Sequence, residues 1–555
     1  MSNSLSSADK NTLEFKKSCR EIINELLQVS DFKKIKDINR IKLKIIKKYN
    51  NVPIPKNSDI LFYATQEEFE KLVDFLKIKK VRSISGIVVV AIMSEPYPCP
   101  HGKCLYCPGG PNSHFNSPQS YTGFEPATRR GIQNSFDPYK QVSKRLEQLK
   151  GIGHDTSKIE LIIMGGTFPA RSFEYQADFI KNSLAAIVDF ESNKKLDLKN
   201  ETLENVILRC ENSKHRLVGF TVETRPDFCD KNRINFLLNS GVTRVELGVQ
   251  TIYNEIYKLV ERGHTIEDVI TATQLLKDSG FKVLYHIMPN LPGSNLEMDL
   301  DIFKTIYSDP RFKPDLLKVY PCLVIKGTKL YDLWKQGKYK PYPLDDTINL
   351  LSSAFSQIPP WIRIQRVQRD IPVEYIEAGV KKSNLRELVH QNLKNNGLRC
   401  NCIRCREVGL VELKENRIPD SKNIKLIKTV YEASNGIEIF LSYEDIVKHI
   451  LIGYLRLRIP SEKAFRPEIT EKNSAIVRAL HIYGSVVPID NKFYPYLSNW
   501  QHKKFGTKLL ETAESIAKND FDIKKILIIS GIGVREYYFK FGYKKDGPYV
   551  SKNLN

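Results

Sequence analysis

The middle of the chain alternates short apolar runs with longer stretches of helical periodicity. Apolar runs of strand length lie at Ile87–Met93, Ile159–Met164, Leu217–Val222, Val242–Val249, Lys282–Met288 and Leu316–Tyr320. Segments between them, such as Tyr139–Leu149, Tyr175–Ile187, Lys231–Ser240 and Ile266–Ser279, have helical patterns. Serial strand–helix units predict an α/β fold, a partial TIM-like barrel over residues 85–372. The active residues of such a barrel lie where its strands end.

The pattern differs on either side of this region. Residues 1–84 are basic and helical, and isoleucines and leucines between residues 33 and 48 give one amphipathic stripe. From residue 421 to 555, strands at Ile437–Tyr443, Ile450–Ile459 and Ser474–Val487 precede a helix starting near Gln501, and Lys525–Ser530 is a last strand. This order predicts a C-terminal α+β domain, with residues 373–420 as a linker.

The charge of the chain favours a polyanionic partner. Its 555 residues, 41% hydrophobic, predict a globular protein of two to four domains, and its formal net charge is +21. We expect the basic N-terminal helix and a later Cys-rich turn to contact nucleic acid; the alternative is a solvated helix face. The residues expected to do so are Lys33, Lys34, Lys36, Arg40, Lys42, Lys44, Lys47, Lys48, Arg404 and Arg406.

The compartment follows from what the sequence lacks. Ten cysteines in 555 residues do not make a disulfide scaffold, and several lie in ligand-like groups, so a reducing interior is expected. No apolar run reaches membrane-spanning length, and the first residues lack the apolar core of a signal peptide. We therefore expect a cytoplasmic protein.

The first ligand-like group is the run Cys99-Pro-His-Gly-Lys-Cys104-Leu-Tyr-Cys107, which follows the first predicted strand. Thiols in C-x4-C-x2-C spacing can hold three irons of a [4Fe–4S] cluster and leave the fourth open. An open iron at a barrel mouth is what the radical chemistry of S-adenosylmethionine (SAM) requires. On spacing alone, a zinc knuckle or three unrelated thiols are the alternatives.

Residues at the ends of later strands fit the same cofactor. Gly165 and Gly166 follow the second strand, where exposed backbone groups could hold the amino acid end of SAM. An ordinary tight turn is the alternative. Thr167 comes next, and Gln250 ends the fourth strand, where it could bond the ribose. His286 could face the same mouth or be a core histidine.

The second ligand-like group is the run Cys400-Asn-Cys402-Ile-Arg-Cys405. Its C-x-C-x2-C spacing predicts three ligands of a structural Zn²⁺. The fourth ligand must come from elsewhere: Cys322 and His390 are the candidates, and Cys322 is preferred. Inert surface thiols are the alternative.

Several longer motifs resemble the catalytic subunit of Elongator. They are the segments 99–111, 119–126, 363–372, 384–388 and 481–488. The similarity covers nearly the whole chain from about residue 30, and the short first Cys spacing resembles single-chain prokaryotic members. In that family a radical-SAM barrel is fused to a GNAT-like acetyltransferase domain. The family installs a carboxymethyl-type group on C5 of the wobble uridine, position 34, of tRNA.

The resemblance implies that the C-terminal domain binds acetyl-CoA. The matching positions are Ala479, Leu480, His481, Ile482, Phe505, Gly506, Thr507 and Tyr537. The resemblance also implies catalytic roles for three residues: Tyr537 and Tyr538 near the thioester, and Lys158 as a barrel-side contact to the same ligand, although a solvent lysine is the alternative there. Two positions depart from the pattern: Lys504 stands where the GNAT loop has glycine, and Ala479 where the family usually has Glu.

The function implied by the resemblance is radical-SAM addition of a carboxymethyl group to tRNA with acetyl-CoA as co-substrate. Expected partners are the anticodon stem-loop of tRNA and an electron donor; a homodimer is compatible with the sequence, and no further subunit is required. The main alternative is a protein lysine N-acetyltransferase, which would not need the Cys99 triad. A radical enzyme for another RNA base would not need the acetyl-CoA loop. A tRNA-binding scaffold with an inactive site is a third class.

Overall fold

The computed structural model describes every residue except 1–12, 29–37, 50–51, 485–499, 501–502 and 555. The chain forms two compact units. The first contains Met1–Ser83 and Lys144–Thr156, and the second contains Ile84–Ser143 and Ser157–Asn555.

The first unit is helical. Its described helices are α1 (Leu13–Leu27), α2 (Ile38–Ile46), α3 (Asn57–Phe62) and α4 (Gln66–Leu76). Their apolar stripes meet in one core, in which Ile22, Ile45 and Leu72 are almost fully buried. A capping box between Thr65 and Glu68 fixes the start of α4 by satisfying two otherwise unpaired backbone amides.

The second unit begins with the predicted barrel, which is confirmed as a half-barrel. Its strands are β1 (Val88–Met93), β2 (Lys158–Met164), β3 (Arg216–Thr224), β4 (Arg244–Gln250), β5 (Lys282–Ile287), β6 (Leu316–Val319) and β7 (Arg363–Val367). All neighbours pair in parallel, in sequence order, and among the described residues β1 does not pair with β7. The strand β7 was not predicted because its sequence, Arg-Ile-Gln-Arg-Val, is mostly polar.

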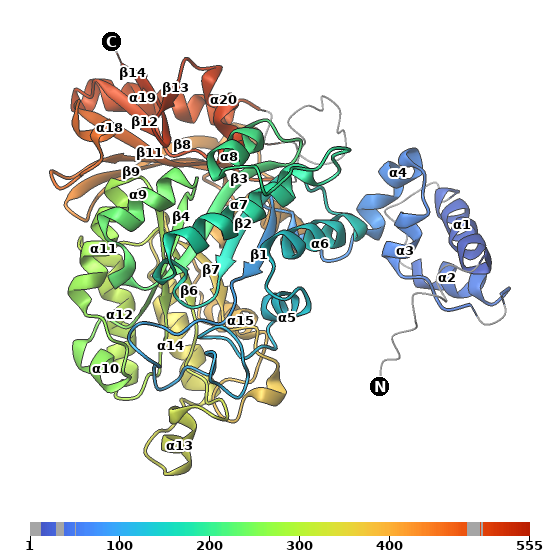
Figure 1. Ribbon diagram of the computed structural model, residues 1–555, viewed down its shortest axis with the longest axis horizontal. Helices are drawn as coiled ribbons and strands as arrows, with labels where there is room; N and C mark the ends of the chain where they lie inside the picture. The colour runs from blue at the N-terminus through green and yellow to red at the C-terminus, as the bar shows by residue number, and fades with distance from the viewer. Residues whose placement is uncertain (1–12, 29–37, 50–51, 485–499, 501–502, 555) are drawn as a thin grey trace. The chain divides into compact units, whose positions relative to one another are not determined.

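Helices join these strands. They are α5 (Pro126–Gln133), α6 (Pro138–Gly151), α7 (Phe173–Asp189), α8 (Leu203–Glu211), α9 (Lys231–Asn239), α10 (Asn254–Leu259), α11 (Ile266–Asp278), α12 (Leu296–Ser308), α13 (Lys329–Lys335) and α14 (Leu344–Ser356). Of these, α9, α11 and α12 flank the half-barrel, whereas α13 projects away from the sheet at the bottom of the view (Figure 1). The helices α15 (Leu385–Asn395), α16 (Ile403–Arg406) and α17 (Val408–Glu415) follow β7. None of the described helices is both long enough and apolar enough to cross a bilayer.

A mixed sheet forms the C-terminal part of the second unit. Its strands are β8 (Ile424–Ala433), β9 (Gly436–Asp445), β10 (Ile450–Ile459), β11 (Ser474–Ile482), β12 (Lys525–Ile528), β13 (Lys544–Asp546) and β14 (Tyr549–Asn553), and its helices are α18 (Pro467–Thr470), α19 (Phe505–Phe521) and α20 (Arg535–Phe539). Only β11 and β12 pair in parallel. The helix α19 packs on the sheet through Leu509, Leu510 and Ala513. The predicted C-terminal α+β domain is thus confirmed.

Buried charges join the mixed sheet to the half-barrel. This ion network consists of Lys277, Asp278, Asp315, Glu438, Arg456, Arg458 and Arg478. Arg478 in β11 binds Asp315, just before β6, with Nη1–Oδ2 and Nη2–Oδ1 distances of 2.8 and 2.7 Å. Its Nη1 also donates to the carbonyl of Phe281, just before β5. The mixed sheet is therefore fastened to the N-terminal ends of β5 and β6.

The pairing in this network lowers the cost of burying so many charges. Burial alone would raise the pKa of Asp315, but Arg478, Lys277 and Arg456 hold it well below its usual range. Burial lowers the pKa of Lys277 to about 8, so its ammonium is easier to deprotonate than that of a surface lysine but stays mostly charged at neutral pH.

We predict that Arg478→Met lowers the free energy of unfolding by about 3–5 kcal/mol, because it leaves the Asp315 carboxylate buried without its bidentate partner. Urea denaturation followed by circular dichroism measures this. The matched control is Lys428→Met, since Lys428 pairs with Asp520 at 2.7 Å on the exposed surface, and it should cost less than about 1 kcal/mol. Equal losses in the two variants would contradict the prediction.

Candidate active site

The cysteine loop that follows β1 surrounds its thiols with hydrogen-bond donors. One of these donors is Arg262, which is 7% exposed. A hydrogen bond from Arg262 to the carbonyl of Gly248, at 2.6 Å, holds its guanidinium in place. Hydrogen bonds to thiolate sulfur stabilise the charged form that ligates iron. The contacts are Thr167 Oγ1 to Cys99 Sγ (3.5 Å), His101 Nε2 to Cys104 Sγ (3.2 Å), Arg262 Nη1 to Cys104 Sγ (3.6 Å) and Ser120 N to Cys107 Sγ (3.2 Å).

These three thiols fit a cluster better than a single ion. Among the described residues, the Cys99 triad is not one of the groups whose ligand atoms all lie within 4.8 Å of one another. One zinc ion would hold its sulfurs closer than that, because each Zn–S bond is about 2.3 Å long. Burial raises the pKa of Cys99 and raises that of Cys107 to about 11, so both are protonated at neutral pH and would release protons on binding iron.

The residues predicted to bind SAM lie where β2 and β4 end. Gly165 and Gly166 have φ of +128° and +75°, in the left-handed region that favours glycine. A Cβ on Gly165 would lie 2.2 Å from Ser94 Oγ, so any other residue would have to displace that hydroxyl as well as adopt the strained φ. Gln250 also has a positive φ of +73°, and its buried Oε1 has no hydrogen-bond partner in the described structure. A strained residue with an orphaned acceptor indicates a place for a ligand's donor.

Two features of this mouth were missed from the sequence. Arg262 lies 158 residues from the thiol that it contacts, so no local motif marks it. Asn290 after β5 and Gln368 after β7 share the positive φ of Gln250, at +64° and +71°. Left-handed backbone is recognised in a sequence mainly through glycine, and neither residue carries that signal.

Charged side chains fill the interior of the half-barrel. We call them the polar column: Lys282, Arg244, Glu160, Glu246, His286, Lys318, Glu223 and Tyr121. Arg244 forms ion pairs with Glu160 and, at 3.4 Å, with Glu246. The carboxylate of Glu246 also forms an ion pair with Lys318 and a hydrogen bond with His286 Nε2, the latter at 2.9 Å. His286 is therefore paired inside the barrel.

The column continues to the cysteine loop. Lys318 Nζ lies 3.1 Å from Glu223 Oε1, and Tyr121 Oη donates to Glu223 Oε2 at 2.6 Å. Tyr121 follows Ser120, whose amide bonds Cys107. Glu223, Glu246 and His286 lie close enough to ligate a metal, but the Lys318 ammonium occupies the centre of that group. These residues are thus a salt-bridged network that links the two ends of the strands.

Two strands of the mixed sheet separate where acetyl-CoA was expected. The ladder between β11 and β12 ends at Val477 and Ile528, whereas β11 continues to Ile482. In the described structure, no strand takes the place of β12 beside the end of β11. Backbone groups along that edge, in the segment 479–482, could therefore bind an extended ligand.

The loop before α19 completes this region. Lys504, at the N-cap of α19, has φ of +60°. This left-handed conformation favours glycine, the residue that GNAT loops have at this position. For a lysine it costs about 1–2 kcal/mol. A Cβ on Gly506 would lie 3.2 Å from Tyr537 Oη, so the loop and Tyr537 are in close approach. The donors of Phe505, Gly506 and Thr507 open the helix, where an anion is stabilised.

The remaining predicted residues near acetyl-CoA differ in their surroundings. Tyr538 is 7% exposed and packs against Tyr543 in the domain core, and its catalytic role stays a prediction. His481 Nε2 donates to the carbonyl of Ser85 at 3.0 Å, and burial lowers its pKa to about 4, so its ring is neutral. Lys158 opens β2, two residues before Glu160 and hence on the same face.

The second cysteine group is assembled as predicted, but its expected fourth ligand is wrong. The sulfurs of Cys400, Cys402 and Cys405 all lie within 4.8 Å of one another. Cys322 instead packs beside Cys104 and Tyr339 in another cluster. His390 Nε2, on α15, lies 3.6 Å from Cys405 Sγ. The fold accounts for this difference, since α15 brings the imidazole to Cys405 whereas Cys322 follows β6 and lies in another cluster; in the described structure the imidazole is not within 4.8 Å of all three sulfurs.

Several cations predicted to contact nucleic acid have other partners. Lys42 is 4% exposed and donates to Asn57, and Arg406 is 8% exposed and pairs with Glu444 and two backbone carbonyls; these two assignments are wrong. Lys44 and Lys48 pair with Glu25 and Glu21 of α1. Arg40 and Lys47 are exposed and Arg404 is half-buried. Lys33, Lys34 and Lys36 lie outside the described residues.

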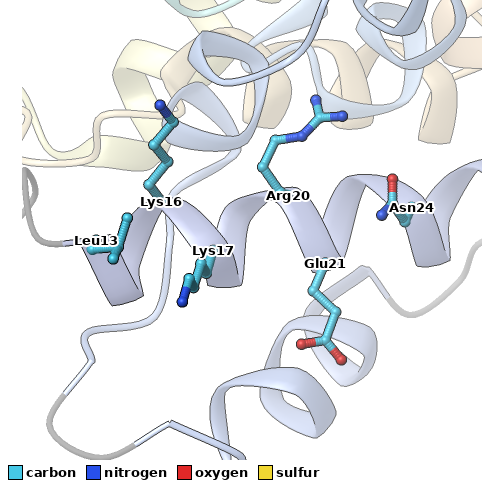
Figure 2. A pocket seen from close by; sticks show the side chains of 6 residues that line it. All are labelled: Leu13, Lys16, Lys17, Arg20, Glu21 and Asn24. Carbon is cyan, nitrogen blue, oxygen red and sulfur yellow. The ribbon is translucent and has the colours of Figure 1, made fainter.

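The helix α1 offers basic residues that the sequence analysis did not select. Lys16 and Lys17 are exposed and have no ion-pair partner among the described residues. Figure 2 shows both beside a pocket lined by Leu13, Lys16, Lys17, Arg20, Glu21 and Asn24. The signal was present as a Lys-Lys pair on an amphipathic helix, but the denser charge run at residues 33–48 concealed it.

The half-barrel, its cysteine loop and the glycine pair after β2 define a radical SAM protein. Residues 96–306 match the Radical SAM superfamily, residues 314–395 the Radical_SAM C-terminal domain, and residues 15–84 the ELP3 N-terminal domain. Membership of the superfamily implies a [4Fe–4S] cluster and SAM, which the thiols, donors and glycines above would hold.

The chain belongs to the Elongator complex protein 3 family. It is 54% identical over 523 residues to the tRNA uridine(34) acetyltransferase of Methanocaldococcus jannaschii, covering 94% of each chain. It is 43% identical over 546 residues to Elongator complex protein 3 of Schizosaccharomyces pombe, covering 97% of this chain and 98% of that protein. A solved structure of Methanocaldococcus infernus Elp3 lacking residues 1–46 matches with a TM-score of 0.74 and 50% identity, covering 85% of this chain and 100% of that one.

We propose that the Cys400 triad and His390 hold one structural Zn²⁺. The purified protein should then contain about one zinc per chain, and His390→Ala should lose most of it, because three thiolates without the imidazole leave the tetrahedral site incomplete. Mass spectrometry of the metal content checks this. The matched control is Cys322→Ser, which should keep the zinc. Loss of zinc from Cys322→Ser together with retention of zinc in His390→Ala would make Cys322 the fourth ligand instead.

Proposed function

We propose that this protein is a tRNA-modifying enzyme that joins the acetyl methyl carbon of acetyl-CoA to C5 of wobble uridine 34. Hydrolysis of the thioester then leaves a carboxymethyl group on the base. The observation that carries the proposal is one folded unit with two sites: a radical SAM mouth at the C-terminal ends of the barrel strands and an open β11 edge beside the α19 loop. Relatives spanning nearly the whole chain are named for tRNA uridine(34).

Each site contributes a defined part of the chemistry. When bound, the cluster and SAM supply a radical that abstracts hydrogen from carbon. Arg262 and His101 hold the Cys104 sulfur in place. Gly165, Gly166, Thr167 and Gln250 present backbone and side-chain groups to SAM. In the mixed sheet, segment 479–482 and Phe505–Thr507 would bind acetyl-CoA, with Tyr537 beside the loop.

The substrate class follows from charge. A net charge of +21 favours a polyanion, and the exposed Lys16 and Lys17 of α1 have no ion-pair partner among the described residues. An anticodon-loop uridine can be splayed from its stack, as a base must be to enter a barrel. A single-stranded loop of tRNA therefore fits both requirements.

The decisive test is anaerobic. The cluster is reconstituted, and SAM, a reductant, tRNA and methyl-labelled acetyl-CoA are added before the tRNA is digested for nucleoside mass spectrometry. Labelled carboxymethyluridine is the expected product. Cys104→Ser should abolish both this product and 5′-deoxyadenosine while leaving tRNA affinity within about twofold, since Cys104 lies in the metal site rather than on the basic surface.

A different outcome would assign the chain to another class. Unlabelled tRNA together with acetylated lysine on an added protein would favour a protein lysine N-acetyltransferase. Continued formation of 5′-deoxyadenosine by Cys104→Ser would overturn the cluster assignment.

The basic surface of α1 has its own prediction. Replacing Lys16 and Lys17 with Ala should weaken tRNA binding and reduce the slope of log affinity against log salt by roughly 1–2, because fewer counterions are released. Fluorescence anisotropy at several salt concentrations measures the slope. The control replaces the exposed Lys422 and Lys425 of the C-terminal domain. An unchanged slope in the α1 variant would remove this helix from the binding surface.

A further inference from the structure

The polar column ends beside the strand expected to bind acetyl-CoA. Lys282 is the first residue of β5 and is the register partner of Arg244 in β4, so their side chains share a face. Lys158 opens β2 on that same inner face, two residues before Glu160. The charge of Lys282 also helps to lower the pKa of His481 in β11, which places the ammonium near segment 479–482.

The end of the polar column beside β11 has hydrogen-bond donors without acceptors. Glu160, Glu246 and Glu223 each have a cationic partner, and Lys282 is the cation left over. Its Nζ has no hydrogen-bond or ion-pair partner in the described part of the chain, and it is half-buried. Arg244 is 6% exposed, and its Nε likewise has no acceptor there. A buried donor such as Arg244 Nε is costly unless a ligand satisfies it, and the Lys282 ammonium beside it is a half-buried cation without a paired carboxylate in the described structure.

The environment of Lys282 agrees with an anion site. Burial, and then the neighbouring Arg244, lower its pKa to about 8, so its positive charge is poorly compensated. A carboxylate or a polarised carbonyl oxygen would supply the missing negative charge. Lys282 and β11 belong to the same compact unit, in which His481 of β11 donates to the carbonyl of Ser85 at 3.0 Å.

We propose that Lys282 and Arg244 bind the oxygen atoms of a two-carbon acyl or carboxylate group where the half-barrel meets the mixed sheet. The inference rests on the proposed function and adds an internal site for the acyl group between the two cofactors. Further along the column, Lys318 and His286 offer donors in the direction of the cysteine loop. The column would thus hold a small polar group inside the barrel, where a TIM barrel has packed apolar side chains.

The test compares Lys282→Met with Lys282→Arg in the reconstituted enzyme. The measured quantity is labelled carboxymethyluridine formed per 5′-deoxyadenosine. Lys282→Met should lower this ratio at least about tenfold, because a hydrogen bond to a charged group is lost, and Lys282→Arg should restore it to within about threefold. The affinity for desacetyl CoA should stay the same in both. The control is Lys425→Met, the same change on the exposed edge strand β8.

The outcomes separate the inference from the proposed function. A wild-type enzyme that makes no labelled nucleoside overturns the proposed function and the acyl site with it. A productive wild type with an equally productive Lys282→Met overturns the acyl site alone. Should Lys282→Met not fold, wild-type protein decides the matter: sodium acetate should slow reductive methylation of Lys282 relative to sodium chloride at equal ionic strength, and equal rates would overturn the site.

Discussion

The bidentate pair between Arg478 and Asp315 is the interaction on which the rest of the second unit depends. Both side chains are fully buried, and each would be strongly destabilising without the other. Arg456, Arg458 and Glu438 surround the pair, so charges from β9, β10 and β11 are neutralised by groups at the base of β5 and β6. A network of this kind is satisfied in one arrangement only. The mixed sheet is therefore held against one end of the half-barrel rather than tethered by a linker.

This attachment determines where chemistry can occur. The strands β1–β7 are parallel, so their C-terminal ends share one rim, and the cysteine loop, the glycine pair and Gln250 all lie there. The mixed sheet occupies the opposite ends, with Gly531 and Gly533 so close to the start of β3 that a Cβ would lie 2.4 and 2.6 Å from its backbone. Two sites at opposite ends of the same strands can cooperate only through or around the barrel. The charged interior of the half-barrel is consistent with a route through the barrel.

Strand periodicity and local motifs were sufficient for much of this architecture. Continuous apolar runs predicted β1–β6, and the Cys spacing with Gly165 and Gly166 predicted the radical SAM mouth. The strand β7 could not be predicted from its polar residues, whose environment is set by neighbours in the sheet. Pairings distant in sequence were equally inaccessible, as with His390 rather than Cys322 beside Cys405. A run of lysines gives the charge of a helix but not its contacts, and Lys42 proved to be buried against Asn57.

Several positions at which stability is sacrificed lie together in the half-barrel. Left-handed backbone at Gln250, Asn290 and Gln368, a row of charges in place of apolar packing, and the unpartnered donors of Lys282 and Arg244 all line the inside or the rim of one half-barrel. Each carries a cost that a core designed only for stability would avoid. The apolar core between the mixed sheet and α19, together with the helices around the half-barrel, supplies stability that offsets these costs. Strained backbone and unsatisfied donors inside a half-barrel are what a site for polar substrates requires, since a barrel packed with valine and leucine could neither admit nor orient them.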